Sequence, residues 1–348
     1  MSWDDILLTN HKSIPQSVLL EGRYSEFFNF YNNLETHIAL LRDSVRTEAF
    51  RDAILQNREF FEGKIVLDVG CGTAILSLFA ADAGASKVIA VENTDTADLA
   101  LEIVKDNDKE HVVKVVKGLV EQLKLPDGIE KVDIIISEWM GNALYMEGML
   151  NSVLFARDKW LKPGGLILPS LANLWMIGAS DPHRMANLNF WRDVEGIDMS
   201  CLRKQFSQAP TVDCVPIQQL LTDECWIHST HLDTVRNEPV VFRSNFVLRV
   251  LRPGVINVLV LYFDVGFFYG ENQTPITLCT SPRSPWTHWE QTLLHLDEPL
   301  FVKANDQVRG ILAMMPSAVN GRCMNFELSI SFRGDRTRVE SFKRFTSD

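Results

Sequence analysis

The sequence predicts a doubly wound α/β domain followed by a second domain built mainly of antiparallel strands. A glycine turn follows an apolar strand and precedes a helix at Lys64–Gly72 (KIVLDVGCG). The apolar run Ile134–Ile136 is typical of a strand buried on both faces of a parallel sheet. From Leu171 onward, short segments of alternating polarity favour a sandwich or barrel. A chain of 348 residues is long enough for both domains.

The N-terminal part is predicted to be an extension followed by helix. Residues 1–22 carry little pattern, whereas Tyr24–Arg58 has apolar residues at helical spacing. The polar residues His37, Asp43 and Arg46 interrupt this segment. Such residues on an amphipathic helix usually mark a solvated face, so their meaning depends on the motifs that follow.

The glycine turn Asp68–Ala74 (DVGCGTA) predicts a site for a nucleoside-like ligand. Gly70 and Gly72 allow close approach of the backbone, and the N-terminus of the next helix favours an anionic group. Glu92 ends the next strand 20 residues after Gly72, where a ribose acceptor is expected. Ile75 replaces the third glycine of a dinucleotide fingerprint, which favours a small anionic tail over a pyrophosphate. A turn with only a structural role is the alternative.

Three further acids follow later strands. Val112–Gly118 is predicted to be a strand, and Glu121 just beyond it is a weak candidate to accept from an adenine amino group. Glu138 follows the strand at 132–136, at the sheet edge where such folds bind ligands, and Glu147 lies nine residues later. If this loop turns back tightly, both acids face one pocket and suit a planar, always charged guanidinium. An N-cap acid and an exposed loop acid are the common alternative.

Pro169 is the predicted boundary between the α/β domain (23–169) and the β-rich domain (170–348). Within the second domain, residues 187–221 have a different, partly helical pattern. This segment would dock on another subunit or pack on its own domain. His288 lies in a proline-rich loop beside Trp289, and a histidine with aromatic neighbours is more often packed than catalytic.

Charge and cysteine usage limit the possible partners and compartments. The net charge of −11, spread along the chain, argues against nucleic acid and is compatible with a basic peptide or a solvated acidic surface. The six cysteines show no metal-ligand spacing, so we expect reduced thiols and no metal site. No secretory signal or run of ~18 apolar residues is present. We therefore expect a soluble protein, free of the membrane, in the cytoplasm, the nucleus or both.

Taken together, the motifs resemble those of the protein arginine N-methyltransferase family from about Tyr24 to Phe332. VLDVGCGTA with AVE resembles its S-adenosylmethionine-binding motif, and SEWMG…MEGML its double-glutamate loop. THW and NFWRDVEGIDMSCLR resemble its threonine-histidine-tryptophan loop and the start of its dimerisation arm. The resemblance implies an α/β Rossmann-like S-adenosylmethionine-binding domain, a β-barrel domain with a helical dimerisation arm, and a homodimer.

The resemblance also implies a role for each candidate residue. Glu138 and Glu147 would hold the substrate guanidinium, and His288 with Asp43 would accept the proton. The implied cofactor-binding residues are His37, Arg46, Asp68, Gly70, Gly72, Glu92, Glu121 and Met149. The implied substrate pocket consists of Tyr31, Met140 and Trp289.

The sequence departs from the family pattern at Phe27, Leu40, Ala74, Asn142 and Met146, where tyrosine, methionine, glycine, tyrosine and tyrosine are usual. None of these changes removes a charge. The resemblance is closest to type I members, which would form mono- and asymmetric dimethylarginine in Gly/Arg-rich proteins or histones. The alternatives are a catalytically weak relative that acts as a binding or heteromeric partner subunit, and a small-molecule methyltransferase.

Overall fold

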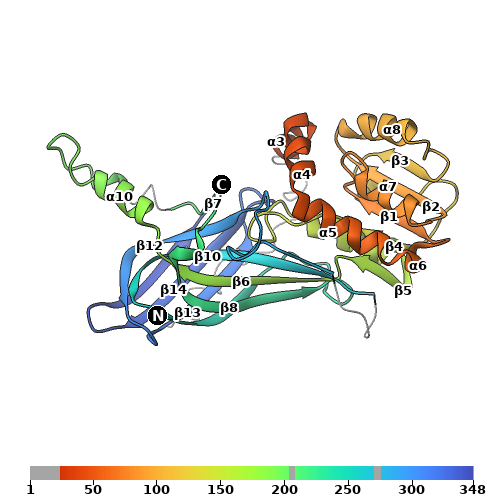
Figure 1. Cartoon of the computed structure of the whole chain (residues 1–348). Coiled ribbons are helices and arrows are strands. Elements are labelled where there is room, and N and C mark those ends of the chain that lie inside the picture. Colours follow the sequence, from red (N-terminus) through yellow and green to blue (C-terminus); the bar gives the residue numbers. More distant parts are fainter. Residues whose placement is uncertain (1–23, 204–207, 270–275, 348) are drawn as a thin grey trace.

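The computed structural model describes residues 24–203, 208–269 and 276–347, and the side chains from Phe28 onward within them. The extension predicted for residues 1–22 lies outside this range. Two bodies lie side by side, an α/β domain and a β-barrel, as Figure 1 shows. Within the described residues, no helix has the length and apolarity required to cross a membrane.

The N-terminal helical segment is divided into short helices rather than continuous from Tyr24 to Arg58. Two of the three breaks occur at polar residues whose side chains cap the next helix. Asn33 accepts from Glu35 N at 3.0 Å, and Asp43 accepts from Arg46 N at 2.9 Å. The helices are α3 (Tyr24–Asn32), α4 (Leu34–Arg42), α5 (Ser44–Leu55) and α6 (Arg58–Phe61).

The first domain contains a five-stranded parallel sheet in the order β3-β2-β1-β4-β5. From β1 the chain adds β2 and β3 on one side and then β4 and β5 on the other, so the strand order changes direction between β1 and β4. Open α/β sheets bind ligands at such a point. The strands are β1 (Ile65–Val69), β2 (Lys87–Glu92), β3 (Val113–Lys117), β4 (Val132–Ile136) and β5 (Leu161–Leu168). Their helices are α7 (Ile75–Asp82), α8 (Thr96–Asp106), η1 (Val120–Gln122) and α9 (Met149–Trp160).

The second domain begins at β6, where parallel pairing gives way to antiparallel pairing. A six-stranded sheet includes the path β7-β12-β10-β6-β8 with β11 beside β10, and a four-stranded sheet has the order β15-β14-β13-β9. A bridge between Thr222 and Val250 joins the sheets on one side, and Lys343 Nζ donates to His295 O at 2.8 Å on the other. The strands are β6 (Leu171–Ala179), β7 (Thr211–Asp213), β8 (Leu220–His231), β9 (Phe242–Arg249), β10 (Gly254–Phe267), β11 (Ile276–Cys279), β12 (Gln291–Val302), β13 (Gln307–Pro316), β14 (Met324–Arg333) and β15 (Arg338–Phe345).

The segment predicted as an arm differs from the prediction at both ends. Its helix, α10 (Pro182–Phe190), begins before position 187 because Asp181 caps it and Pro182 suits the first turn. At the other end, η2 (Ile217–Gln219) leads into β8, so positions 220 and 221 belong to the barrel. In Figure 1, α10 projects from the end of the barrel that is far from the α/β domain. The fold class predicted from the sequence is confirmed.

Candidate active site

A cavity opens at the carboxyl ends of the central parallel strands, beneath α3 and α4. It contains about 1070 Å³ of empty space, part of it continuous with solvent, which is enough for a cofactor and a substrate side chain together. Most of the candidate residues line it: Tyr31, His37, Arg46, Gly70, Gly72, Glu92, Glu121, Glu138, Met140, Glu147 and Met149.

One half of the cavity presents acceptors to a nucleoside. The Glu92 carboxylate accepts from Gly72 N at 3.0 Å and Thr94 N at 2.8 Å, which fixes its position. Each carboxylate oxygen has a second lone pair, so Glu92 is still able to accept from ribose hydroxyls. Glu121 is oriented by Ser152, whose hydroxyl donates to it at 2.6 Å.

Arg46 lies between the cofactor half and the substrate half. Its Nε donates to Glu138 Oε2 at 3.0 Å, its Nη2 forms an ion pair with the same oxygen at 3.0 Å, and only 7% of the residue is exposed. Its Nη1 is buried and has no hydrogen-bond partner among the described residues. Because an unsatisfied buried donor is costly, a carboxylate ligand at Nη1 fits the site. The methionyl carboxylate of S-adenosylmethionine is such a group.

His37 fastens the N-terminal helices over this half. Its Nε2 lies 2.7 Å from Tyr31 O and 3.0 Å from the Thr96 hydroxyl, which itself donates to Tyr31 O at 2.9 Å. A Cβ at Gly72 would lie 3.4 Å from the His37 ring, and a Cβ at Gly70 would lie 2.8 Å from Met149 Cε. The helices α3 and α4 form a lid on this cavity. The two glycines therefore let the lid and α9 approach the turn closely.

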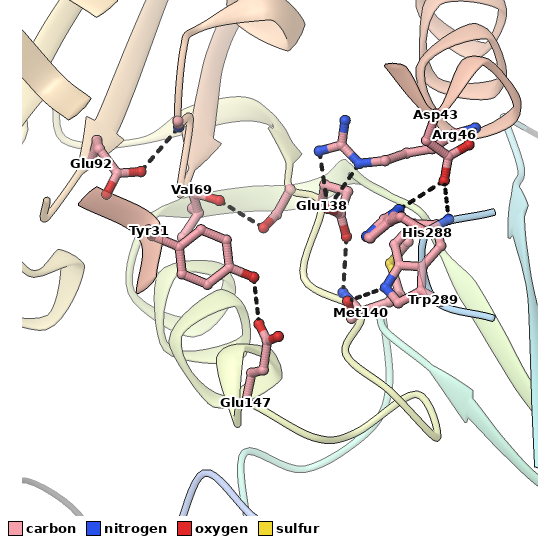
Figure 2. Close-up of polar contacts among 12 residues, drawn as sticks. Tyr31, Asp43, Arg46, Val69, Glu92, Glu138, Met140, Glu147, His288 and Trp289 are labelled. Atoms are coloured by element: carbon pink, nitrogen blue, oxygen red, sulfur yellow. Dashed lines mark hydrogen bonds and ion pairs between the residues drawn. The ribbon is translucent and has the colours of Figure 1, made fainter. Parts of the chain in front are cut away.

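Glu138 and Glu147 stand at the two ends of one loop after β4, as Figure 2 shows. The loop turns back through backbone at positive φ, including Ala143 (47°), Leu144 (70°) and Glu147 (76°). Tyr31 donates its hydroxyl to Glu147 Oε2 at 2.7 Å. Burial raises the pKa of Glu147 to about 7; the Tyr31 hydrogen bond opposes this rise and the negative charge of Glu138 adds to it. Two partly buried acids in one cavity favour a cationic ligand.

His288 and Asp43 come together at the edge of the site. His288 Nδ1 lies 2.7 Å from Asp43 Oδ2, and the backbone N of His288 donates to the same oxygen at 2.8 Å. The pKa of Asp43 is lowered: burial raises it, but the hydrogen bonds from His288 and the Arg46 backbone outweigh burial. Asp43 is thus an ionised partner that orients the imidazole. Neither residue lines the cavity wall.

Two residues require correction. Asp68 was predicted to bind cofactor, but it is fully buried beneath the turn and does not line the cavity. It accepts from Ser77 Oγ at 2.7 Å, and burial raises its pKa to about 7. Trp289 was predicted in the substrate pocket, yet it is 3% exposed and donates from Nε1 to Met140 O at 2.8 Å. Both side chains support the site from behind: Trp289 Nε1 is directed to a backbone carbonyl and Asp68 Oδ2 to a hydroxyl, whereas Asp68 Oδ1 is buried and has no hydrogen-bond partner among the described residues.

The structure describes the side chains of four of the five positions that depart from the family pattern. Leu40 lines the cavity. Ala74 is fully buried with a φ of 64°, a conformation that favours the usual glycine. Met146 N donates to Asn142 O at 3.2 Å inside the double-glutamate loop. The side chain of Phe27 lies outside the described residues.

Several residues of the site carried no signal in the sequence. Thr96 and Ser152 orient His37 and Glu121, and Arg322 lines the cavity from the barrel. Each lies in a segment without a motif, and Arg322 is 175 positions from its partner Glu147. Only the folded chain brings them to the cavity.

The ionisation of Glu147 predicts a pH dependence. A guanidinium requires the carboxylate form, so kcat/KM should fall as the pH drops through about 7. In the protein without substrate, the protonated form of Glu147 contributes to the free energy of unfolding. This contribution is fully present below pH 4.5, the ordinary pKa of the group, and is lost as the pH rises through the raised pKa of about 7. Tyr31→Phe removes a hydrogen bond that favours the carboxylate form of Glu147. The acid limb of the pH profile, where kcat/KM falls at low pH, should therefore shift to higher pH. Tyr262→Phe, in the barrel, is the control; an unshifted limb in Tyr31→Phe would contradict the assignment to Glu147.

Comparison with known proteins identifies relatives along nearly the whole chain. A family model described as "Arginine methyltransferase oligomerization subdomain" matches residues 170–335, and one described as "Ribosomal protein L11 methyltransferase (PrmA)" matches residues 53–170. Protein arginine N-methyltransferase 1 of Dictyostelium discoideum is 39% identical over 316 residues, 90% of this chain and 92% of that protein. Its counterpart from Chlamydomonas reinhardtii is 38% identical over 334 residues, 96% of this chain and 95% of that protein.

Solved structures agree. A chain of the Trypanosoma brucei PRMT1 enzyme–prozyme heterotetrameric complex with AdoHcy matches with a TM-score of 0.87 and 39% identity, covering 91% of this chain and 99% of that one. Protein arginine methyltransferase 10 of Arabidopsis thaliana matches with a TM-score of 0.82 and 33% identity, covering 92% and 100%. The resemblance and the enzyme class predicted from the sequence are confirmed. The chain belongs to the protein arginine N-methyltransferase family.

Proposed function

We propose that this methyltransferase modifies arginine side chains in Gly/Arg-rich proteins or histones and forms mono- and asymmetric dimethylarginine. The observation that carries the proposal is the placement of Glu138 and Glu147 in one cavity beside Arg46. The reaction uses S-adenosylmethionine, which supplies an electrophilic methyl group on a sulfonium when it is bound. Arg46, Glu92 and Glu121 would hold its carboxylate, ribose and adenine.

The chain contributes orientation and charge. Glu138 and Glu147 accept hydrogen bonds from the substrate guanidinium and hold its nitrogen in line for attack, which is a large part of the acceleration in a displacement reaction. Glu138 is already bonded to Arg46, and Glu147 to Tyr31, so the two acids differ in strength as acceptors. Unequal hydrogen bonding biases positive charge away from the attacking nitrogen. The His288–Asp43 pair accepts the proton that leaves as the methyl group arrives.

The assay that tests this function uses methyl-labelled cofactor with a Gly/Arg-rich peptide or a histone H4 tail, read by mass spectrometry. Asymmetric dimethylarginine with a monomethyl intermediate is the expected product. A symmetric or monomethyl-only product would overturn the product assignment. If the cofactor binds normally but no methyl group is transferred to either peptide, the result would favour a second candidate function, a binding or heteromeric partner subunit. The departures at Leu40, Asn142 and Met146 are the observation behind that second candidate.

We propose that the chain assembles as a homodimer through the arm, and that it resides in the cytoplasm, the nucleus or both. No side chain of α10 is buried, and Phe190 and Ile197 are 56% and 58% exposed on a segment that projects from the barrel. Exposed apolar side chains on a projecting helix favour a protein partner.

Light scattering tests the assembly. Phe190→Asp combined with Ile197→Asp should reduce the mass from that of a dimer to about that of the 39.5 kDa chain, because the charges would be buried at the interface. Val247→Asp, at an exposed position of the barrel, is the matched control and should remain dimeric. A double variant with the mass of the wild type would remove the arm from the interface.

A further inference from the structure

We propose that Arg322, in the turn between β13 and β14, is a positioning residue that holds Glu147 in the orientation required for methyl transfer. The inference rests on the proposed use of Glu147 to bind the substrate guanidinium. It assigns to the barrel, which already contributes His288 at the edge of the site, a direct part in the geometry of the double-glutamate loop.

Arg322 engages both backbone polar groups of Glu147. The Glu147 N donates to Arg322 O at 2.6 Å, and Arg322 Nη1 donates to Glu147 O at 2.6 Å. One residue of the barrel therefore fixes the peptide groups on both sides of the Glu147 Cα. The direction of the Glu147 side chain follows from the position of that Cα.

The backbone of Glu147 needs such support. Its φ is 76°, and Gly148 follows at 65°. The left-handed region is unfavourable for a residue with a Cβ, and it persists where surrounding contacts over-determine the conformation. A Cβ added at Gly148 would lie 3.5 Å from Gly321 O, so the two segments are packed closely at this point. The turn of the barrel is thus the neighbour that holds the loop in its strained form.

The turn itself is rigidly built. Ser317 N donates to Cys323 O at 2.8 Å, and Cys323 N donates to Asn320 O at 2.9 Å. The Asn320 side chain accepts from Arg322 N at 3.1 Å. A turn closed by these bonds presents Arg322 in one orientation, as a support for a catalytic carboxylate requires.

The Arg322 guanidinium also links Glu147 to the lid. Its Cζ lies 5.3 Å from the centroid of the Phe28 ring on α3, the helix that also carries Tyr31. Arg322 lines the cavity, and its positive charge opposes the rise in the pKa of Glu147 that burial causes. The same side chain thus contacts the lid helix and the double-glutamate loop.

Kinetics of Arg322→Met and Arg322→Lys test the proposal. Arg322→Met should lower kcat by about 30-fold, change the Kd for S-adenosylmethionine by less than about twofold, and move the acid limb of kcat/KM to higher pH. Arg322→Lys keeps the charge but not the planar fork, so its acid limb should stay near that of the wild type while kcat falls about tenfold. Arg309→Met, at an exposed position on β13 outside the cavity lining, is the matched control.

A kcat within twofold of the wild type and an unmoved acid limb in Arg322→Met would overturn the proposal. If the methionine variant does not fold, the same comparison is made with the lysine variant, whose kcat decides. If the wild type itself methylates no peptide, the proposed function fails, and hydrogen exchange tests the support of Glu147 separately. The Glu147 amide should then exchange about tenfold faster in Arg322→Lys; an unchanged rate would refute the positioning role.

Discussion

Glu147→Gln is expected to lower kcat/KM for a Gly/Arg-rich peptide by about 10³-fold. Glutamine keeps the shape and still accepts the Tyr31 hydroxyl, so the loss isolates the negative charge. Removing one member of a buried, hydrogen-bonded charge pair costs about 2–5 kcal/mol, and about 4 kcal/mol corresponds to 10³-fold. The loss should appear in the chemical step because only the charged form biases the guanidinium for attack.

Cofactor affinity separates this effect from general damage. Among the described residues, Glu147 forms no hydrogen bond or ion pair with Arg46, Glu92 or Glu121, so calorimetric binding of S-adenosylmethionine should be unchanged within about twofold. Glu59→Gln, at an exposed position of helix α6, is the control for the loss of one negative charge. Activity of Glu147→Gln within tenfold of the wild type would exclude the two-carboxylate mechanism.

Arg46→Met is expected to reduce both stability and cofactor affinity. It leaves the Glu138 carboxylate, whose side chain is 11% exposed, without its cationic partner. Breaking a buried ion pair from one side costs about 3–5 kcal/mol, so the free energy of unfolding should fall by about 3 kcal/mol. The Kd for S-adenosylmethionine should rise at least about 100-fold, because a charge-assisted hydrogen bond to its carboxylate is lost.

A double-mutant cycle shows whether the lost pair is the cause. Combining Arg46→Met with Glu138→Gln should restore part of the stability, because glutamine leaves no unpaired buried charge. Denaturant unfolding of the four proteins measures the coupling. Strictly additive losses of stability would contradict the buried ion pair, whereas cofactor affinity should stay low in the double variant.

The sequence by itself determined the elements whose physics is local. Apolar runs such as Ile134–Ile136 predict buried parallel strands, and the glycine turn Asp68–Ala74 marks where a ligand approaches the backbone. The two acids of the loop after β4, together with the neighbouring motifs, predicted a pocket for a guanidinium. The structure places Glu138 and Glu147 on one cavity, as that interpretation requires.

Tertiary structure alone decided what each acid is bonded to. Asp68 lies in β1 just before the glycine turn and Glu92 ends the neighbouring strand β2, yet Asp68 is buried on Ser77 while Glu92 faces the cavity. The division of the N-terminal helix at Asp43 places that residue against His288, 245 positions away. Arg322 carried no signal because its partner Glu147 is reached only when the barrel packs on the double-glutamate loop. Periodicity and motifs report on neighbours along the chain, whereas the charges that tune a site are set by segments that meet only after folding.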